Sequence, residues 1–164
     1  VDAIIPPGNT MVHLNNLCKT LEQHVPSKET DTATALHQIA ASIRRRALVI
    51  LFSDLFDDTE RVMNALAHFR RLRHDVIVFP PLDRVELDLD LPKGGRFIDM
   101  ETGEDLVADP RALAKTYRHV VGEFLEHIRD RCAEMNIDYR LIDTEHELEP
   151  FVRAYLEERK RLSR

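Results

Sequence analysis

The sequence predicts an α/β fold in which a doubly wound, mostly parallel sheet is covered by helices. Two observations carry this prediction. Residues 47–52 (ALVILF) and 75–79 (DVIVF) are almost continuously apolar, which is typical of strands buried on both faces of a parallel sheet. Segments with the periodicity of amphipathic helices precede and follow these runs, so strand and helix alternate along the chain.

A single domain is expected over residues 1–164, because 164 residues suffice for one hydrophobic core of ordinary size. Hydrophobic residues make up 43% and charged residues 32% of the sequence, a balance typical of globular proteins. The chain begins with Val1 in what reads as the end of a strand. We therefore expect a truncated domain whose first strands lie upstream.

Two helices are predicted before the first apolar run. One begins after Pro6-Pro7-Gly8, where Asn9 or Thr10 can cap it. The other begins near Thr30 or Asp31 and ends at the arginine triplet 44–46. Its apolar residues recur at the spacing of one buried helix face: Ala35, Leu36, Ile39, Ala40 and Ile43.

Residues 47–52 are predicted to form a central strand, and a helix follows them. Asp57 with Glu60 resembles a capping box for that helix. Its expected core positions are Val62, Leu66, Phe69 and Leu72. The second strand, residues 75–79, should end at Pro80-Pro81, because proline cannot donate to a strand ladder.

A small antiparallel insertion is predicted next. Residues 84–91 alternate charged and apolar side chains, and residues 96–100 and 104–107 flank a turn that contains Gly103. Asp109-Pro110 is a strong start for a long helix reaching about Met135. A last strand at 137–143 and a closing helix from about Thr144 complete the expected sheet. The predicted buried side of the long helix consists of Leu113, Tyr117, Val120, Phe124, Ile128 and Cys132, and that of the closing helix consists of Leu148, Phe151, Val152, Tyr155 and Leu156.

Composition argues against several functional classes. The net charge is −6 and the chain has no Trp, whereas nucleic-acid binding needs a basic face with stacking aromatics. No apolar run approaches the roughly 20 residues of a membrane span. Cys18 and Cys132 have no metal-ligand or CxxC spacing and are expected to be buried free thiols. The eight histidines likewise lack ligand spacing. Because the sequence shows no membrane span and no disulfide pattern, we expect a cytoplasmic protein.

The order of elements and two local motifs resemble the latter part of a von Willebrand factor A-like domain. Residues 29–36 (ETDTATAL) are similar to that family's threonine loop, and residues 51–54 (LFSD) to its strand that ends in Ser/Thr-Asp. The resemblance implies a metal-ion-dependent adhesion site with Thr30 and Asp54 as ligands of Mg²⁺, which prefers hard oxygen donors. Without the resemblance, Thr30 would be read as a helix cap.

The sequence departs from that family because it contains no Asp-x-Ser-x-Ser. In the family this motif follows the first strand, which we expect upstream of Val1. The chain then holds at most two of the site's side-chain ligands, and magnesium binding should be weak or absent. Ser53, Thr32 and Asp57 are expected to support the site from neighbouring positions.

A narrower resemblance covers nearly the whole chain. Residues 45–58, 97–113 and 138–144, with Pro6-Pro7-Gly8, are similar to the domain-of-unknown-function family 58. Bacterial proteins of that family carry the von Willebrand A-like fold and commonly accompany MoxR-type AAA+ ATPases. The resemblance implies an adaptor that works with such an ATPase.

The leading functional hypothesis is therefore a non-catalytic protein-interaction module with a partial metal site. One alternative is a Mg²⁺-dependent phosphohydrolase or phosphoacceptor domain, because Ser53-Asp54 at a strand end also suits that chemistry. The other is a metal-free structural scaffold. Truncation should leave the strand at 47–52 with an open edge, so the chain is expected to self-associate through it.

Overall fold

The computed structural model describes residues 4–24, 31–91, 95–98, 105–108 and 110–162. These residues fall into two compact units, residues 1–31 and residues 32–164.

The first unit contains the helix α1 (Met11–Gln23), which begins where the sequence predicts. The hydroxyl oxygen of Thr10 caps it by accepting a hydrogen bond from the backbone N–H of His13 (3.1 Å). None of the residues of α1 is buried. Cys18 is exposed, so the expectation of two buried thiols is wrong for this residue.

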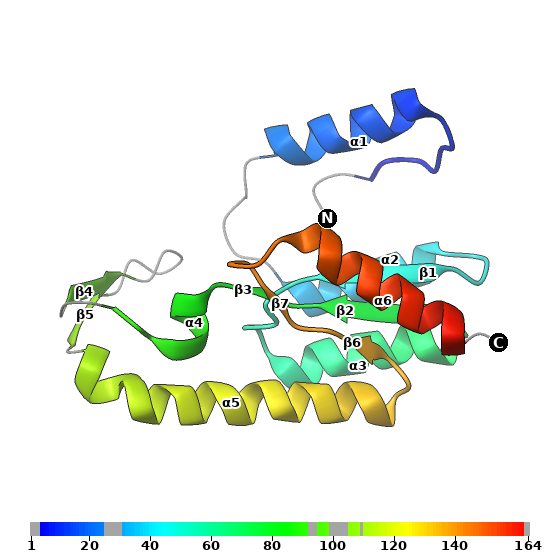
Figure 1. Cartoon of the computed structure of the whole chain (residues 1–164). Helices are drawn as coiled ribbons and strands as arrows, with labels where there is room; N and C mark the ends of the chain where they lie inside the picture. Colours follow the sequence, from blue (N-terminus) through cyan, green and yellow to red (C-terminus); the bar gives the residue numbers. More distant parts are fainter. Residues whose placement is uncertain (1–3, 25–30, 92–94, 99–104, 109, 163–164) are drawn as a thin grey trace. The chain divides into compact units, whose positions relative to one another are not determined.

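The second unit is built on a parallel sheet of three strands in the order β1 (Leu48–Phe52), β2 (Asp75–Phe79) and β6 (Asp138–Tyr139) (Figure 1). β1 and β2 pair in parallel along their whole length, with Leu48 opposite Asp75. Beyond them the short strands β3 (Pro81–Leu82) and β7 (Ile142–Asp143) also pair in parallel. The predicted α/β fold with a parallel sheet is confirmed at this level.

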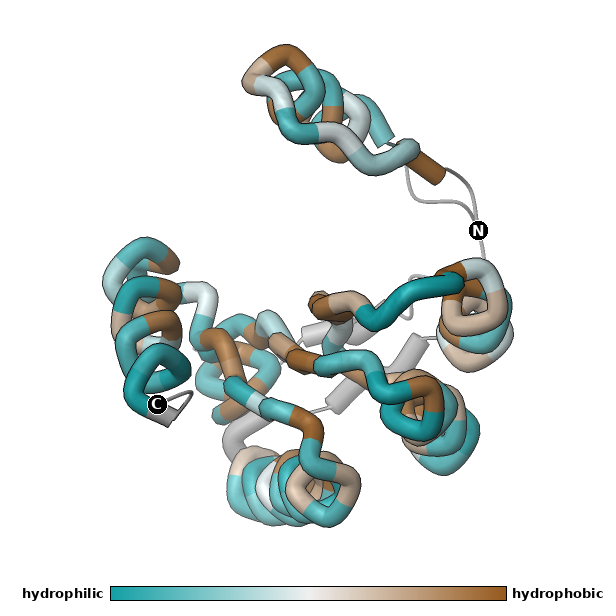
Figure 2. Tube along the Cα trace, turned by 90° about the vertical axis from the view of Figure 1, so that its right-hand side faces the viewer, coloured by the Kyte–Doolittle hydropathy of each residue, from teal (hydrophilic) through white to brown (hydrophobic). Residues whose placement is uncertain are grey.

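Helices lie on both faces of the sheet, as Figure 2 shows in a view along the strands. On one face, α2 (Thr32–Ser42), α3 (Thr59–Arg71) and α5 (Pro110–Glu134) share a core with the sheet. Its largest fully buried side chains include Phe69, Leu66, Met63 and Ile128. On the other face, α6 (Leu148–Leu162) packs Phe151 and Tyr155 against Ile77 and Phe79 of β2.

Among the described residues the strand at 47–52 is not central, which differs from the prediction of a central strand and agrees with the prediction of an open edge. β2 lies in the middle of the sheet, while β1 lies at one side. The side chains of β1 alternate between exposed and half-buried positions. The apolar run indicates a strand with apolar side chains on both faces, but the described residues cover only one of those faces.

The prediction of an antiparallel insertion is partly correct. β4 (Gly95–Ile98) and β5 (Asp105–Ala108) do pair in antiparallel fashion, and the turn between them lies outside the described residues. Residues 84–91 are not a strand, because Arg84–Asp88 forms the short helix α4. Asp83 and Glu86 make a capping box at its start, and this local hydrogen bonding decides the conformation over the alternating pattern.

The two C-terminal helices bury some of their predicted core positions, including Ile128, Cys132 and Tyr155, and expose others. In α5 Val121 is buried and Val120 is exposed. α6 begins at Leu148 rather than near Thr144, and its residues Leu148, Val152 and Leu156 are exposed although the sequence pattern placed them in the core. Leu72, the last predicted core position of α3, is its exposed C-cap.

Candidate functional site

The loop that follows β1 leaves the carboxyl edge of the sheet, where ligands of open α/β sheets bind. Leu55 in this loop has a positive φ of 63° and is buried. The Ser53 hydroxyl accepts a hydrogen bond from Leu55 N–H (3.2 Å), and Asp54 Oδ1 accepts one from Phe56 N–H (3.2 Å). Both side chains therefore hold the turn in which they lie.

Asp57 joins this loop to the start of α2. Its Oδ2 accepts a hydrogen bond from the backbone N–H of Thr32 (3.0 Å), and its Oδ1 accepts one from Asp58 N–H (2.7 Å). A carboxylate at a helix N-terminus satisfies an amide that has no partner within the helix and complements the helix dipole. The bond fixes Thr32, the first residue of α2, beside the loop after β1.

The helix cap at the start of α3 is Asp58, not Asp57 as the sequence analysis proposed. Asp58 Oδ1 accepts a hydrogen bond from Arg61 N–H (3.1 Å). Arg61 also donates from its guanidinium to the hydroxyl of Thr34 on α2 (3.4 Å). The starts of α2 and α3 are thus joined twice, through Asp57 and through Arg61.

The predicted metal ligands are only partly described. Thr30 lies outside the described residues, so its predicted proximity to Asp54 stays a prediction. Asp54 is exposed and offers carboxylate oxygens of the kind that Mg²⁺ prefers. Within the described part of the chain, however, no three His, Cys, Asp or Glu side chains come together as a metal site would require. These residues alone do not make a complete magnesium site.

A second group of polar side chains lies at the carboxyl ends of β3 and β7. The Thr144 hydroxyl donates to Asp83 Oδ2 (3.3 Å), and Arg84 lies 3.7 Å from Asp143 Oδ2. The backbone N–H of Glu145 lowers the pKa of Asp143, and His146 and Arg84 add to this effect. This group was not predicted from the sequence, although Asp83 directly follows β3 and Asp143 is the last residue of β7.

An open cavity of about 550 Å³ borders this second group. Asp143 and His146 contribute polar groups to its wall, and Leu148, Pro150 and Phe151 contribute apolar surface. His146 Nδ1 lies 3.4 Å from Asp143 Oδ2. The cavity lies where β7 leads into α6, so it is framed by the part of the chain that covers the second face of the sheet.

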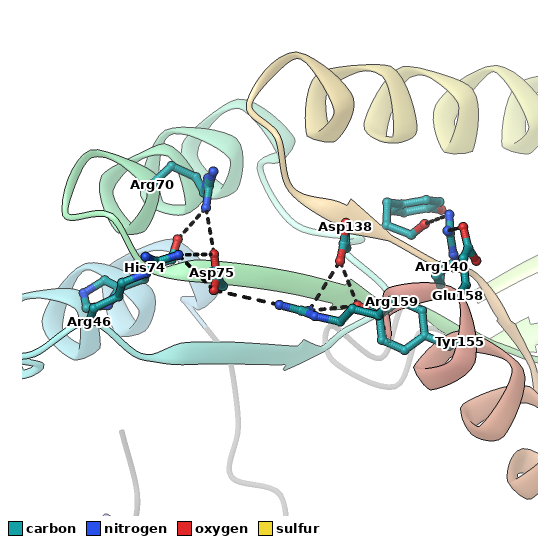
Figure 3. Close-up of polar contacts among 10 residues, drawn as sticks. Arg46, Arg70, His74, Asp75, Asp138, Arg140, Tyr155, Glu158 and Arg159 are labelled. Carbon is teal, nitrogen blue, oxygen red and sulfur yellow. Dashed lines mark hydrogen bonds and ion pairs between the residues drawn. The ribbon is translucent and has the colours of Figure 1, made fainter. Parts of the chain in front are cut away.

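The opposite edge of the sheet carries a network of ion pairs (Figure 3). Asp75, the first residue of β2, lies within ion-pair distance of Arg46 (3.2 Å), Arg70 (3.6 Å) and Arg159 (3.9 Å). Asp138, the first residue of β6, accepts a hydrogen bond from the hydroxyl of Tyr155 on α6 (2.8 Å). The network ties α6 to the amino ends of the strands, which favours a structural role.

The two groups with the largest pKa shifts, the buried Cys132 and the half-buried Tyr139, are unsuited to nucleophilic chemistry. Burial raises the pKa of the Cys132 thiol to about 12. Burial, with a smaller contribution from Cys132, raises the pKa of Tyr139 to about 12. At neutral pH both groups are protonated, and a thiol in that state is a poor nucleophile.

None of the helices in the described part of the chain is both long and apolar enough to cross a bilayer.

The comparisons with known proteins agree with the narrower resemblance noted from the sequence. No curated protein and no solved structure matches the chain. One family model, described as "Protein of unknown function DUF58", matches residues 1–126. Because this match spans most of the 164 residues, the chain belongs to the DUF58 family.

Proposed function

We propose that this DUF58 chain is a non-catalytic protein-interaction module that binds its partner at the carboxyl edge of the sheet. The observation that supports this most is the hydrogen bond between Asp57 and Thr32 (3.0 Å). It joins a loop and a helix start that are 25 residues apart in sequence, and it does so beside the exposed Asp54. A rigid loop that presents an exposed carboxylate is suited to recognition.

Phe56 adds an apolar contact beside Asp54. Its ring is exposed and stacks on Phe124 of α5, with the ring centroids 5.2 Å apart. An aromatic side chain held by stacking loses little conformational entropy when a partner covers it. Aromatic residues are enriched in protein interfaces for such reasons. The proposed contact surface therefore combines Asp54 and Phe56.

The proposal includes a limited contribution from Mg²⁺. Asp54, together with Thr30, would supply oxygen ligands to the ion, which when bound would attract a carboxylate of the partner. Because Asp57 already accepts two backbone N–H groups, it is a poor additional ligand. We therefore expect this chain to bind Mg²⁺ weakly and to depend on it less than a complete site would.

The family resemblance suggests a MoxR-type AAA+ ATPase as the partner, and a binding assay with the purified ATPase tests the proposal. Asp54→Asn keeps an oxygen that can accept from Phe56 N–H but removes the charge. We expect this variant to bind at least about tenfold more weakly, the loss of an interfacial charged contact. Asp130→Ala, at an exposed position on α5, is the control and should bind normally. Equal binding by all three proteins would refute the proposal.

The competing phosphohydrolase hypothesis is tested separately. Asp57 accepts two backbone N–H groups and Asp58 caps α3, so Asp54 is the acidic residue of this loop best placed to act on a substrate. Phosphatase activity that requires Mg²⁺ and disappears in Asp54→Asn would favour an enzyme. We expect no such activity above the level of the variant.

A further inference from the structure

At the protein surface, a pair of histidines joins α2 to α3, two of the helices that pack on the same face of the sheet. His37 of α2 and His68 of α3 approach with their Nδ1 atoms 3.3 Å apart, although they are 31 residues apart in sequence. Their ring centroids are 5.5 Å apart and the ring planes are inclined at 45°. The contact is exposed, so an ion from solvent can reach it.

The backbone positions of both histidines are fixed by the core beneath them. Each one neighbours a buried residue in sequence, Leu36 on α2 and Phe69 on α3. Ala33 and Ala40 of α2 are also buried in the same core. Two ligands on packed helices are held close together before any ion binds, which lowers the entropic cost of binding.

The separation of the two nitrogen atoms matches one geometry of metal coordination. Zn²⁺ binds histidine nitrogen at roughly 2.0–2.1 Å in tetrahedral geometry, which places two ligand nitrogens about 3.3–3.4 Å apart. Neighbouring ligands of a square-planar ion at the same bond length would be about 2.9 Å apart. The observed 3.3 Å fits the tetrahedral ion.

The geometry points to a two-histidine clamp in which His37 Nδ1 and His68 Nδ1 bind one tetrahedral divalent transition-metal ion, Zn²⁺ in the first place. Without the ion, one Nδ1 donates a hydrogen bond to the other. With the ion bound, both Nδ1 lone pairs face it and each ring carries its proton on Nε2. The remaining positions are open to water, since the described residues bring no third His, Cys, Asp or Glu to the pair.

The consequence for the protein is a metal link between α2 and α3. The starts of these helices are already joined through Asp57 and Arg61. The clamp adds a joint between the middle of α2 and the C-terminal half of α3. An ion that binds the folded chain and not the unfolded one raises the stability of the fold. Zn²⁺ should therefore stabilise the chain through these two helices.

Isothermal titration with Zn²⁺ tests the clamp, using His37→Ala, His68→Ala and the double variant. Losing either histidine turns a chelating pair into a single ligand, so each single variant should bind at least about tenfold more weakly. The double variant should bind only slightly more weakly than the single ones, because each single variant has already lost the chelating pair. His119→Ala, which removes an exposed histidine on α5, should leave this binding unchanged.

Thermal unfolding and Co²⁺ absorption provide readouts that do not depend on the heat of binding. Zn²⁺ should raise the unfolding temperature of the unaltered chain and of His119→Ala, but not that of either clamp variant. Co²⁺ should give the visible absorption of a tetrahedral site only when both histidines are present. Unchanged Zn²⁺ affinity in folded His37→Ala and His68→Ala would show that the pair is only a hydrogen bond and would overturn the inference.

Discussion

The two faces of β1 both carry apolar side chains, but the side chains on one face are much more exposed to solvent than those on the other. Val49 and Leu51 are half-buried and pack against the core formed with α2, α3 and α5. Leu48, Ile50 and Phe52 point to the other face and are 51%, 49% and 61% exposed. On the neighbouring β2, α6 covers Phe79 with Phe151 and Tyr155. Among the described residues of the second unit, the cover on this face therefore stops between β2 and β1.

This difference shows what a continuous apolar run does and does not specify. It reflects a strand with apolar side chains on both faces, but it does not say which element covers each face. The ring of Phe52 stacks on that of Phe79, with the ring centroids 5.4 Å apart. The apolar surface that α6 covers on β2 therefore extends to the exposed side chain of Phe52 on β1. Exposed apolar surface next to an open strand edge favours association.

The largest expected effect is a difference in the free energy of unfolding between two Phe→Ala variants, one on the covered side of the sheet and one on the open face of β1. Phe69→Ala on the covered face should reduce the free energy of unfolding by about 3–5 kcal/mol, because it leaves a cavity in the core. Phe52→Ala on the open face should cost less than about 1 kcal/mol. Urea denaturation measures both, and similar losses for the two variants would contradict the assignment of open and covered faces.

The open face and the edge of β1 should also control self-association. We expect the unaltered chain to form dimers or larger species at high concentration. Ile50→Lys should return it to a monomer, because a charge on an edge strand discourages pairing. Asn64→Lys, at an exposed position on α3, is the matched control for added charge. Light scattering measures the mass, and a chain that is monomeric at high concentration would refute this prediction.

The covered face depends on how α2 is fastened at its start. Asp57→Ala removes the acceptor of the Thr32 and Asp58 N–H groups and should cost about 1–2 kcal/mol of stability, as losses of helix caps do. Asp54→Asn retains its turn and should cost less than about 0.5 kcal/mol. A loss for Asp54→Asn as large as that for Asp57→Ala would contradict the different roles given to these carboxylates.

The smallest effect concerns Asp143, just before the helix that covers part of the second face. Its pKa is lowered in the folded chain, first by the N–H of Glu145. The unfolded chain then binds more protons between the two pKa values, so this contribution to stability is present above the unfolded pKa of about 3.9. It is lost as the pH falls through the folded pKa. The urea midpoint should fall between neutral and acidic pH, and it should fall slightly less in Asp143→Asn than in the unaltered chain. An equal fall in the two proteins would contradict the contribution assigned to Asp143.

The parts of the fold that could be predicted are those with a strong periodic or capping signal. The strands at 48–52 and 75–79 and the helix start at Thr10 follow from apolar patterning and cap chemistry. Residues 84–91 were mistaken for a strand because two signals competed, and the capping box of Asp83 and Glu86 prevailed. Periodicity in α6 identified a helix but not which of its two apolar stripes faces the sheet.

The candidate site was less predictable because its contacts are long-range. Asp54 could be selected from its place after a strand, but the bond from Asp57 to Thr32 joins separate elements. Asp57 looked like a cap for α3, and only the folded chain shows that Asp58 takes this role. His37 and His68 lie far apart in sequence, so no spacing rule could connect them.

Hydrogen exchange with and without a MoxR-type ATPase tests the central claim most directly, because it locates the contact surface residue by residue. The account predicts that the partner slows exchange in the loop 53–58 and at the start of α2, in the unaltered chain but not in Asp54→Asn. Protection confined to β1 and α6, with the loop unchanged, would contradict it. The partner would then bind the open face of the sheet.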